Sequence, residues 1–456
     1  MNFTEFIYMA DSFLWGGPLA LLILASGIYF TIKLNFLQVR KLKEALLSLL
    51  RKNDKGEGEI SPFASLCTSL SATIGTGNII GVASAISLGG PGALFWMMTA
   101  AFFGMATKYA EGFLAVKYRI TENGETKGGP FYYIELGMGK VFKPLSYFFA
   151  FSGLGASLLG MGTLVQSNAI ADAVGSFLKD NNNPDFIKFG NVSFSSVTVA
   201  CAILAAVLSG IALVGGIKRI SRIAELTVPF MALLYISLCI IVIAGHAEKI
   251  IPSIYLVIKS AFSPEAALGA ASGITLREAL RQGLSGGVFS NEAGLGTSPI
   301  ADASAKTDSP ESQGLLSMVS VFIDTFVICT LTSLAVLVTG SYKEGGMTGA
   351  EIAEKTFETG FFKGGDVASL LFTLCVVLFA FSTIIGWSCY GEACLSYITK
   401  SDKRGIRAYR FLYILAVFLG PFVSVPTVWT LAKVMNAAMA IPNLIALLFL
   451  SRRIKS

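Results

Sequence analysis

The sequence predicts an all-α integral membrane protein with about eleven transmembrane helices, and three observations support this. The 456 residues are 54% hydrophobic and only 14% charged, whereas soluble domains average about 25% charged residues. Apolar runs of roughly 20 residues, the length that crosses a hydrocarbon core, recur along the chain. The period-2 pattern of an outer-membrane β-barrel is absent, so helices are the expected spanning element.

Eleven segments are long and apolar enough to span a bilayer. They lie near 12–34, 61–86, 92–116, 144–177, 193–214, 223–245, 275–297, 314–339, 367–397, 408–425 and 427–450. The residues before the first segment lack the basic region of a signal peptide, so we expect that segment to remain as a span. No separate soluble domain is expected.

Lysine and arginine gather in alternate loops and thereby predict the orientation. The loop at 35–60 carries six of them, including Arg51, Lys52 and Lys55. Others lie in the loops at 117–143, 218–222 and 400–407 and in the tail at 451–456. Because basic loops stay on the cytoplasmic side, we expect a plasma-membrane protein with an extracellular N-terminus and a cytoplasmic C-terminus.

Two of the spans contain sequences that should weaken a helix. These are SATIGTGNIIG at 71–81 and LSGGVFSNEAGLG at 284–296. Each begins a group of five spans, and since five is odd, the two groups enter the membrane from opposite sides. Glycine-interrupted helices at matching positions in two halves are typical of inverted-repeat transporters with a binding site near the bilayer midplane.

This pattern predicts four regions along the chain. An extra N-terminal helix with its cytoplasmic basic loop occupies 1–60 and precedes the repeats. The first five-helix repeat is expected at 61–246, the second at 247–450, and a cytoplasmic tail at 451–456.

A broken helix frees backbone amides at one half-helix and carbonyls at the other, and in lipid each unpaired group costs several kcal/mol. An amino-acid zwitterion with an alkali cation can satisfy both kinds of group. Close helix packing also explains such glycines, but it explains less easily the polar residues beside them. These are Thr73, Thr76, Asn78, Ser290, Asn291 and Glu292.

Other functional classes receive little support from the residues. The glycines at 75–81 lack the strand that precedes a dinucleotide-binding loop. The only histidine is His246, and the seven cysteines are isolated, without metal-binding spacing, so an enzyme is not expected. A channel needs an open filter with symmetry around a pore, whereas two inverted groups of five suit alternating access better.

Three stretches resemble the alanine or glycine:cation symporter family: SATIGTGNIIG, GGPFYYIELG at 128–137, and GGVFSNEAGLGTSPIADASA at 286–305. The resemblance extends over essentially the whole chain. It implies a LeuT-type fold of five-plus-five inverted repeats with one extra helix in front. It also implies import of small neutral amino acids, mainly alanine and glycine, coupled to Na⁺. Proton coupling remains the alternative, and no cofactor, nucleic-acid partner or required protein partner is implied.

The resemblance also implies a set of binding residues around the first break. The amides of Thr76 and Gly77 would hold the substrate carboxylate, with Gly75 and Asn78 beside them. Na⁺ would be bound by oxygen ligands alone, which suit a hard cation that must leave again. These ligands would be the carbonyls of Ser71 and Ile74 and the hydroxyls of Ser382 and Thr383, although both hydroxyls could instead bond to a carbonyl one turn earlier.

Further candidates come from polar and aromatic residues within spans. Gln166 is preferred over Asn168 as a substrate contact on the third core helix. Phe289 beside Ser290 is expected to wall the substrate's methyl group, unless it faces lipid or core, and Trp387 is a candidate to close the pocket. Intramembrane charges are costly and usually functional. Lys108 and Glu111, three apart on one helix, are expected to form an ion pair. The candidates for gating pairs or proton carriers are Asp172, Glu292, Asp324 and Glu392.

Overall fold

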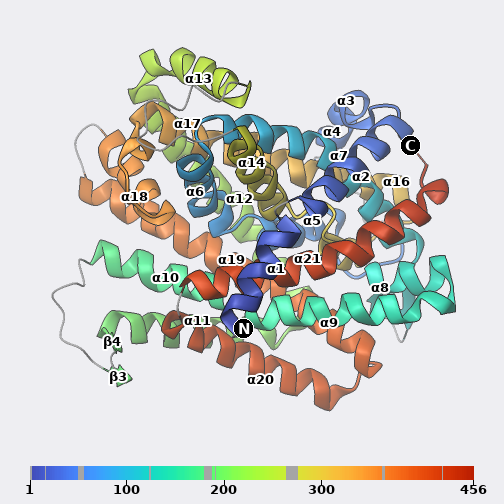
Figure 1. The fold of residues 1–456 in the computed structure, drawn as a ribbon. Coiled ribbons are helices and arrows are strands. Elements are labelled where there is room, and N and C mark those ends of the chain that lie inside the picture. The colour runs from blue at the N-terminus through green and yellow to red at the C-terminus, as the bar shows by residue number, and fades with distance from the viewer. Residues whose placement is uncertain are drawn as a thin grey trace.

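A computed structural model describes residues 3–15, 17–49, 56–122, 125–178, 187–189, 192–262, 276–361, 365–423 and 425–455. Within these residues the predicted all-α architecture is confirmed, and the helices pack side by side in one bundle (Figure 1). The described strands form two short antiparallel hairpins, β1 (Ile120–Glu122) with β2 (Glu125–Lys127) and β3 (Ile187–Phe189) with β4 (Val192–Phe194). The basic residues Arg51, Lys52 and Lys55 lie outside the described residues.

The helices up to the end of the first predicted repeat are α1 (Phe3–Trp15), α2 (Pro18–Lys33), α3 (Leu37–Arg40), α4 (Leu42–Ser48), α5 (Pro62–Thr73), η1 (Thr76–Asn78), α6 (Ile80–Gly89), α7 (Gly92–Lys117), α8 (Pro130–Tyr132), η2 (Tyr133–Met138), η3 (Lys140–Phe142), α9 (Lys143–Leu159), α10 (Leu164–Phe177), α11 (Ser196–Leu213) and α12 (Gly216–Gly245). Those that follow are η5 (Ala247–Lys249), α13 (Ile250–Phe262), α14 (Leu276–Asn291), α15 (Ser298–Asp302), α16 (Pro310–Val321), η7 (Phe322–Cys329), α17 (Thr330–Thr339), η8 (Ser341–Lys343), α18 (Gly349–Gly360), α19 (Gly365–Thr399), α20 (Lys403–Leu419), η9 (Gly420–Phe422), α21 (Val425–Phe449) and η10 (Ser451–Arg453).

Eight helices in the described part of the chain are long and apolar enough to cross a membrane, or nine if α5 and the bent segment after it count as one span. The exact number of eleven is therefore not confirmed. The two predicted spans missing from this count are 92–116 and 275–297, which correspond to α7 and α14. Both carry charged residues, and in α7 these include the fully buried Lys108 and Glu111. Such buried charges lower the mean hydropathy of α7, whereas α14, at 16 residues, is shorter than the helices counted.

Two of the predicted spans contain irregular backbone that the sequence did not indicate. The segment at 144–177 is divided into α9 and α10 by residues 160–163. A Cβ at Gly160 would lie 3.1 Å from Ala432 Cα, so the interruption allows close contact with α21. In the span at 314–339, the helix widens into the π-helical stretch η7, a feature that is frequent at functional sites.

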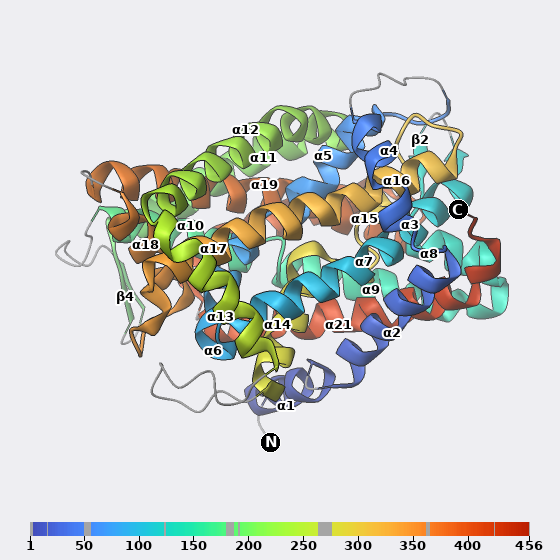
Figure 2. The ribbon, with the colours of Figure 1, turned by 90° about the horizontal axis from the view of Figure 1, so that it is seen from above.

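The two ends of the bundle differ in charge. Both views place α3, α4, α8 and the C-terminus at one end and α13, α18 and β4 at the other (Figures 1 and 2). The basic loops meet at the first of these ends. There Lys117 Nζ donates to the Arg453 carbonyl at 2.8 Å and Lys218 pairs with Glu59 at 3.5 Å. We call this end, which holds the basic loops, the basic end.

Candidate functional site

The first break separates α5 from α6, which are bent by 63° relative to each other. Ser61 caps α5 by accepting a hydrogen bond from the Ala64 amide at 3.0 Å, and the helix ends at Thr73. Ile74 is extended, with φ −76° and ψ 92°. This conformation cannot continue an α-helix, so the backbone groups that follow lose their intrahelical partners.

Asn78 holds the shape of the first break. Its side-chain Oδ1 accepts from the backbone amide of Gly75 at 3.0 Å, and its backbone amide donates to the Gly75 carbonyl at 3.1 Å. Among the described residues, no hydrogen bond reaches the amides of Thr76 and Gly77. Two buried donors thus remain at the break, although buried amides are almost always paired.

Neither glycine at this break is required by an unusual backbone angle, and only Gly75 is required by close approach. Gly75 has φ −135°, and Gly77 is not among the residues with positive φ. A Cβ on Gly75 would lie 2.5 Å from Thr383 Oγ1, whereas a Cβ on Gly77 would meet only Phe289 Cδ1 at 3.9 Å. Gly75 is therefore required by packing, while the space beside Gly77 is open to an added methyl group.

Gln166 on α10 lies against the first break and Asn168 does not. The Thr76 hydroxyl donates to Gln166 Oε1 at 3.0 Å, and Gln166 Nε2 would lie 3.6 Å from a Cβ on Gly75. Gln166 is fully buried, and its Nε2 has no hydrogen-bond partner among the residues that the structure describes. Asn168 instead donates toward the carbonyls of Gly420 and Val423, at 3.5 Å and 3.4 Å. Gln166 thus lies at the first break, whereas Asn168 packs against the segment that follows α20.

The two broken helices meet at Asp324 in η7. Its Oδ1 accepts from Asn78 Nδ2 at 2.7 Å, and its Oδ2 accepts from the Ser290 hydroxyl at 2.8 Å and the Thr325 hydroxyl at 2.9 Å. Asn78 Nδ2 also donates to Ser290 Oγ at 2.9 Å. Sequence reasoning considered Asp324 only for gating or proton transfer and missed this central position. The available signal was its charge inside a span.

The residues expected to bind a cation come together only in part. Thr383 Oγ1 approaches the Ile74 carbonyl at 3.5 Å and also donates to the Phe379 carbonyl at 2.9 Å. Ser382 donates to the same Phe379 carbonyl at 2.9 Å, and Ser71 to the Thr68 carbonyl at 2.7 Å. The hydroxyls of Ser382 and Thr383 thus bond one turn earlier, as the packing alternative expects for these two residues, and only Thr383 also reaches the break.

The aromatic candidates lie in different places. Phe289 is 8% exposed and lies beside Gly77, and its ring packs against Trp429 of α21 with 5.3 Å between centroids. Trp429 was not identified from the sequence. Trp387 is buried beside Gly162 and packs edge-on against Tyr390 at 5.7 Å. Within the described residues, no hydrogen bond or ring contact joins Trp387 to Phe289 or the first break.

The second break, residues 292–297, separates α14 from α15. Glu292, Gly294 and Gly296 have φ of 55°, 89° and 82°, which is unfavourable for the non-glycine residue. The Thr297 hydroxyl donates to Glu292 Oε2 at 2.5 Å. Glu292 therefore lies within the second break and bonds to that break's own residues.

The expected ion pair between Lys108 and Glu111 is absent in the described part of the chain, because each side chain bonds to a different end of the second break. Lys108 Nζ donates to the carbonyls of Asn291 at 3.1 Å and Glu292 at 3.3 Å. Glu111 Oε1 accepts from the Gly296 amide at 3.0 Å. Glu392, another charged candidate, pairs with Arg410 at 2.7 Å.

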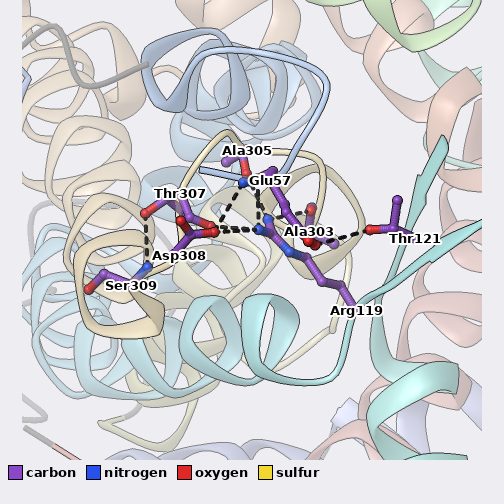
Figure 3. A network of polar contacts seen from close by, with 8 residues as sticks. All are labelled: Glu57, Arg119, Thr121, Ala303, Ala305, Thr307, Asp308 and Ser309. Carbon is purple, nitrogen blue, oxygen red and sulfur yellow. Dashed lines mark hydrogen bonds and ion pairs between the residues drawn. The ribbon is translucent and has the colours of Figure 1, made fainter. Parts of the chain in front are cut away.

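At the basic end, Arg119 joins the segments that flank the two broken helices (Figure 3). Its guanidinium donates to the carbonyls of Glu57 at 2.7 Å and Thr307 at 2.6 Å. It also donates to those of Ala303 at 3.1 Å and Ala305 at 2.7 Å. Residue 57 precedes α5 and residues 303–307 follow α15, so one side chain holds both chain segments together.

Backbone bonds reinforce this connection. The amides of Glu59 and Ile60 donate to the Ser304 carbonyl at 2.8 Å and 3.1 Å, and the Lys306 amide donates to the Ile60 carbonyl at 2.8 Å. Asp308 lies 3.9 Å from Arg119 and accepts from the Glu57 amide at 3.0 Å. We call Arg119 with residues 57–60 and 303–308 the Arg119 clamp.

Comparison with known proteins gives relatives over nearly the whole chain. The sodium/alanine symporter AgcS of Methanococcus maripaludis is 43% identical, with 99% of this chain and 95% of that protein aligned. The probable sodium/glutamine symporter GlnT of Bacillus subtilis is 35% identical over 97% of this chain and 87% of that protein. The putative sodium/proton-dependent alanine carrier YrbD of the same organism is 34% identical over 98% and 90%.

The fold has a counterpart among solved structures. The LeuT-fold transporter MhsT, solved in complex with L-phenylalanine, aligns with a TM-score of 0.61 at 15% identity, covering 86% of this chain and 89% of that one. This likeness confirms the predicted LeuT-type fold.

The family model described as the sodium:alanine symporter family matches residues 1–456. The match covers the whole chain and agrees with the resemblance expected from its glycine-rich motifs. It supports a membrane transporter rather than an enzyme at the level of the family. The chain belongs to the sodium:alanine symporter family.

Proposed function

We propose that the protein is a secondary active symporter that imports small neutral amino acids, in first place alanine and glycine, together with Na⁺ by alternating access. The observation that carries this proposal is a group of three donors that have no partner in the described part of the chain: the amides of Thr76 and Gly77 and, beside them, Gln166 Nε2. Three donors without protein partners suit the carboxylate of an amino acid, because a buried donor without an acceptor is costly.

The coupling ion would bind at the same break, beside the Ile74 carbonyl. The Ile74 carbonyl and Thr383 Oγ1 already lie 3.5 Å apart, and Ser71 and Ser382 are buried nearby on the same two helices. These groups are neutral oxygens, which bind Na⁺ without the strong attraction of a carboxylate. Such a site favours release of the ion on the cytoplasmic side.

Substrate size would be limited by the ring of Phe289. It lies 3.9 Å from the position that a Cβ on Gly77 would occupy, and Trp429 packs behind it. Substrate side chains larger than a methyl group would clash with the Phe289 ring, so alanine and glycine are the expected substrates.

A proton-coupled carrier is the second candidate. Asp324 is a fully buried carboxylate that bonds to both broken helices, and Glu292 is a fully buried carboxylate within the second break. The relative YrbD is described as sodium/proton-dependent. Na⁺ is preferred because the groups beside Ile74 are neutral oxygens that do not exchange protons.

The function is tested by uptake of labelled alanine into proteoliposomes under an inward Na⁺ gradient or an inward proton gradient, each imposed alone. We expect accumulation above the external concentration with the Na⁺ gradient and none with the proton gradient. Accumulation with protons alone would identify the proton-coupled carrier, and equilibration without accumulation would indicate a channel.

Replacing Thr383 with alanine should raise the Na⁺ concentration required for alanine binding. A lost bond to a charged group is worth about 1.5–3 kcal/mol, or about tenfold or more in affinity. Ser388→Ala is the matched control, since Ser388 lies on the same helix and donates to the Ile385 carbonyl at 2.6 Å in the same way. An unchanged Na⁺ dependence in Thr383→Ala would exclude Thr383 as a ligand.

Substitutions at the first break should separate packing from ligand access. Gly75→Ala should lower both thermal stability and alanine binding, because its Cβ would lie 2.5 Å from Thr383 Oγ1. Gly77→Ala should keep its thermal stability and weaken alanine binding by about tenfold, because the methyl group would occupy the ligand's approach. Gly81→Ala serves as the control, because a Cβ on Gly81 would have no neighbouring side chain or backbone atom within 4 Å. Native alanine affinity in Gly77→Ala would refute the amide cradle.

The Arg119 clamp would be the contact that closes the cytoplasmic side. Arg119→Gln should open that side more often, because four hydrogen bonds to backbone carbonyls are weakened together. The reporter is Cys67, a buried residue of α5, kept as the only cysteine and labelled with a permeant maleimide. We expect labelling to become several times faster in Arg119→Gln. It should stay unchanged in Lys127→Gln, which removes a neighbouring lysine that bonds to Glu122 and Ser401 instead. Unchanged labelling in Arg119→Gln would contradict a gating role.

A further inference from the structure

The two breaks differ in how their backbone groups are paired. At the first break, the neutral Asn78 side chain pairs the Gly75 amide, and two further amides have no partner within the described ranges. At the second break, charged side chains bond to both ends. Both of these side chains come from α7.

The carbonyl end of the second break is bound by an ammonium group. Lys108 Nζ donates to the carbonyls of Asn291, the last residue of α14, and Glu292. The carbonyls at a helix C-terminus lack intrahelical partners and carry the negative end of the helix dipole. A cation is the favoured partner there, and Lys108 is fully buried in that position.

The amide end of the second break is bound by a carboxylate. Glu111 Oε1 accepts from the Gly296 amide at 3.0 Å and from Asn443 Nδ2 at 2.6 Å. Asn443 Nδ2 also donates to the Gly294 carbonyl at 2.9 Å, and Asn443 Oδ1 accepts from the Tyr133 hydroxyl. Glu111, on α7, is fully buried. Its position is held by Asn443 of α21, which is held in turn by Tyr133 of η2.

Lys108 and Glu111 thus present an ammonium to carbonyls and a carboxylate to an amide, as a bound amino acid would at the first break. We propose that these two side chains act as a built-in zwitterion that occupies the second break permanently. The second break is then a fixed support rather than a second ligand site. Lys108 and Glu111 are positioning residues, and neither contacts the substrate.

This role connects to the substrate site through α14. Asn291 follows Phe289 and Ser290, and its Nδ2 donates to the Thr325 hydroxyl at 3.1 Å. Any displacement of the end of α14 would therefore move Ser290 relative to Asp324. The effect of Lys108 on alanine binding rests on the proposed function, whereas the state of the second break does not.

Hydrogen–deuterium exchange on the unmodified protein tests the proposal directly. In the absence of alanine and Na⁺, peptides covering 291–298 should exchange slowly, and adding both ligands should change their exchange little. Peptides covering 74–79 should exchange faster and slow down when the ligands are added. Fast exchange at 291–298 that slows on adding alanine would overturn the proposal. A lack of ligand protection at 74–79 would count against the proposed function alone.

Substitution and chemical rescue test the charge itself. Lys108→Met keeps the length of the side chain without its charge and should weaken alanine binding by about tenfold or more. In Lys108→Ala, added n-propylammonium should restore part of the affinity, whereas n-propanol should not. The matched control is Lys117→Met. Native Lys117 lies on the same helix and also donates to a carbonyl, and the Lys117→Met variant should bind alanine normally.

Two outcomes would overturn the role of the Lys108 ammonium. One is an alanine affinity in Lys108→Met within about twofold of the unmodified protein. The other is equal rescue of Lys108→Ala by the alcohol and the amine, which would show that filled volume and not charge is required. If the Lys108 variants do not fold, the exchange measurement on the unmodified protein still decides the proposal.

Discussion

Lipid offers no hydrogen bonds, so every backbone amide and carbonyl in the hydrocarbon layer must find a partner within the protein or its ligands. A continuous helix such as α19, which has no proline, meets this requirement between its two ends. Helical pairing of the backbone is interrupted between α5 and α6, between α9 and α10, and between α14 and α15. Much of the buried polar chemistry of the molecule lies around these interruptions, because the freed groups there need partners.

The interruptions are satisfied by side chains of different character. Asn78, Gln166 and Thr383 bring neutral groups to the first break, and Lys108 and Glu111 bring charges to the second. Neutral partners can be exchanged for a ligand at modest cost, since an ordinary hydrogen bond contributes about 1 kcal/mol net. Removing a buried charge from its partners costs much more, which suits a support that stays in place.

Asp324 and Arg119 connect the two broken helices at different depths. Asp324 bonds to Asn78 from the first break and Ser290 from α14. Arg119 bonds to the segments before α5 and after α15 at the basic end. A change in the relative position of the two helices would disturb both groups of bonds together. This arrangement suits alternating access, in which one side of the site opens while the other is closed.

The sequence by itself determined the membrane-spanning helical class, the two glycine-rich breaks and the family, because composition and local motifs carry this information. Only the tertiary structure decided that Gln166 rather than Asn168 lies against the first break and that Asp324 joins this break to α14. It also decided that Lys108 and Glu111 bind different ends of the second break. These outcomes depend on partners far away in the chain, such as Asn443, which lies 332 residues from Glu111. Spacing along one helix can show that two side chains share a face, but the neighbouring helices decide what each side chain binds.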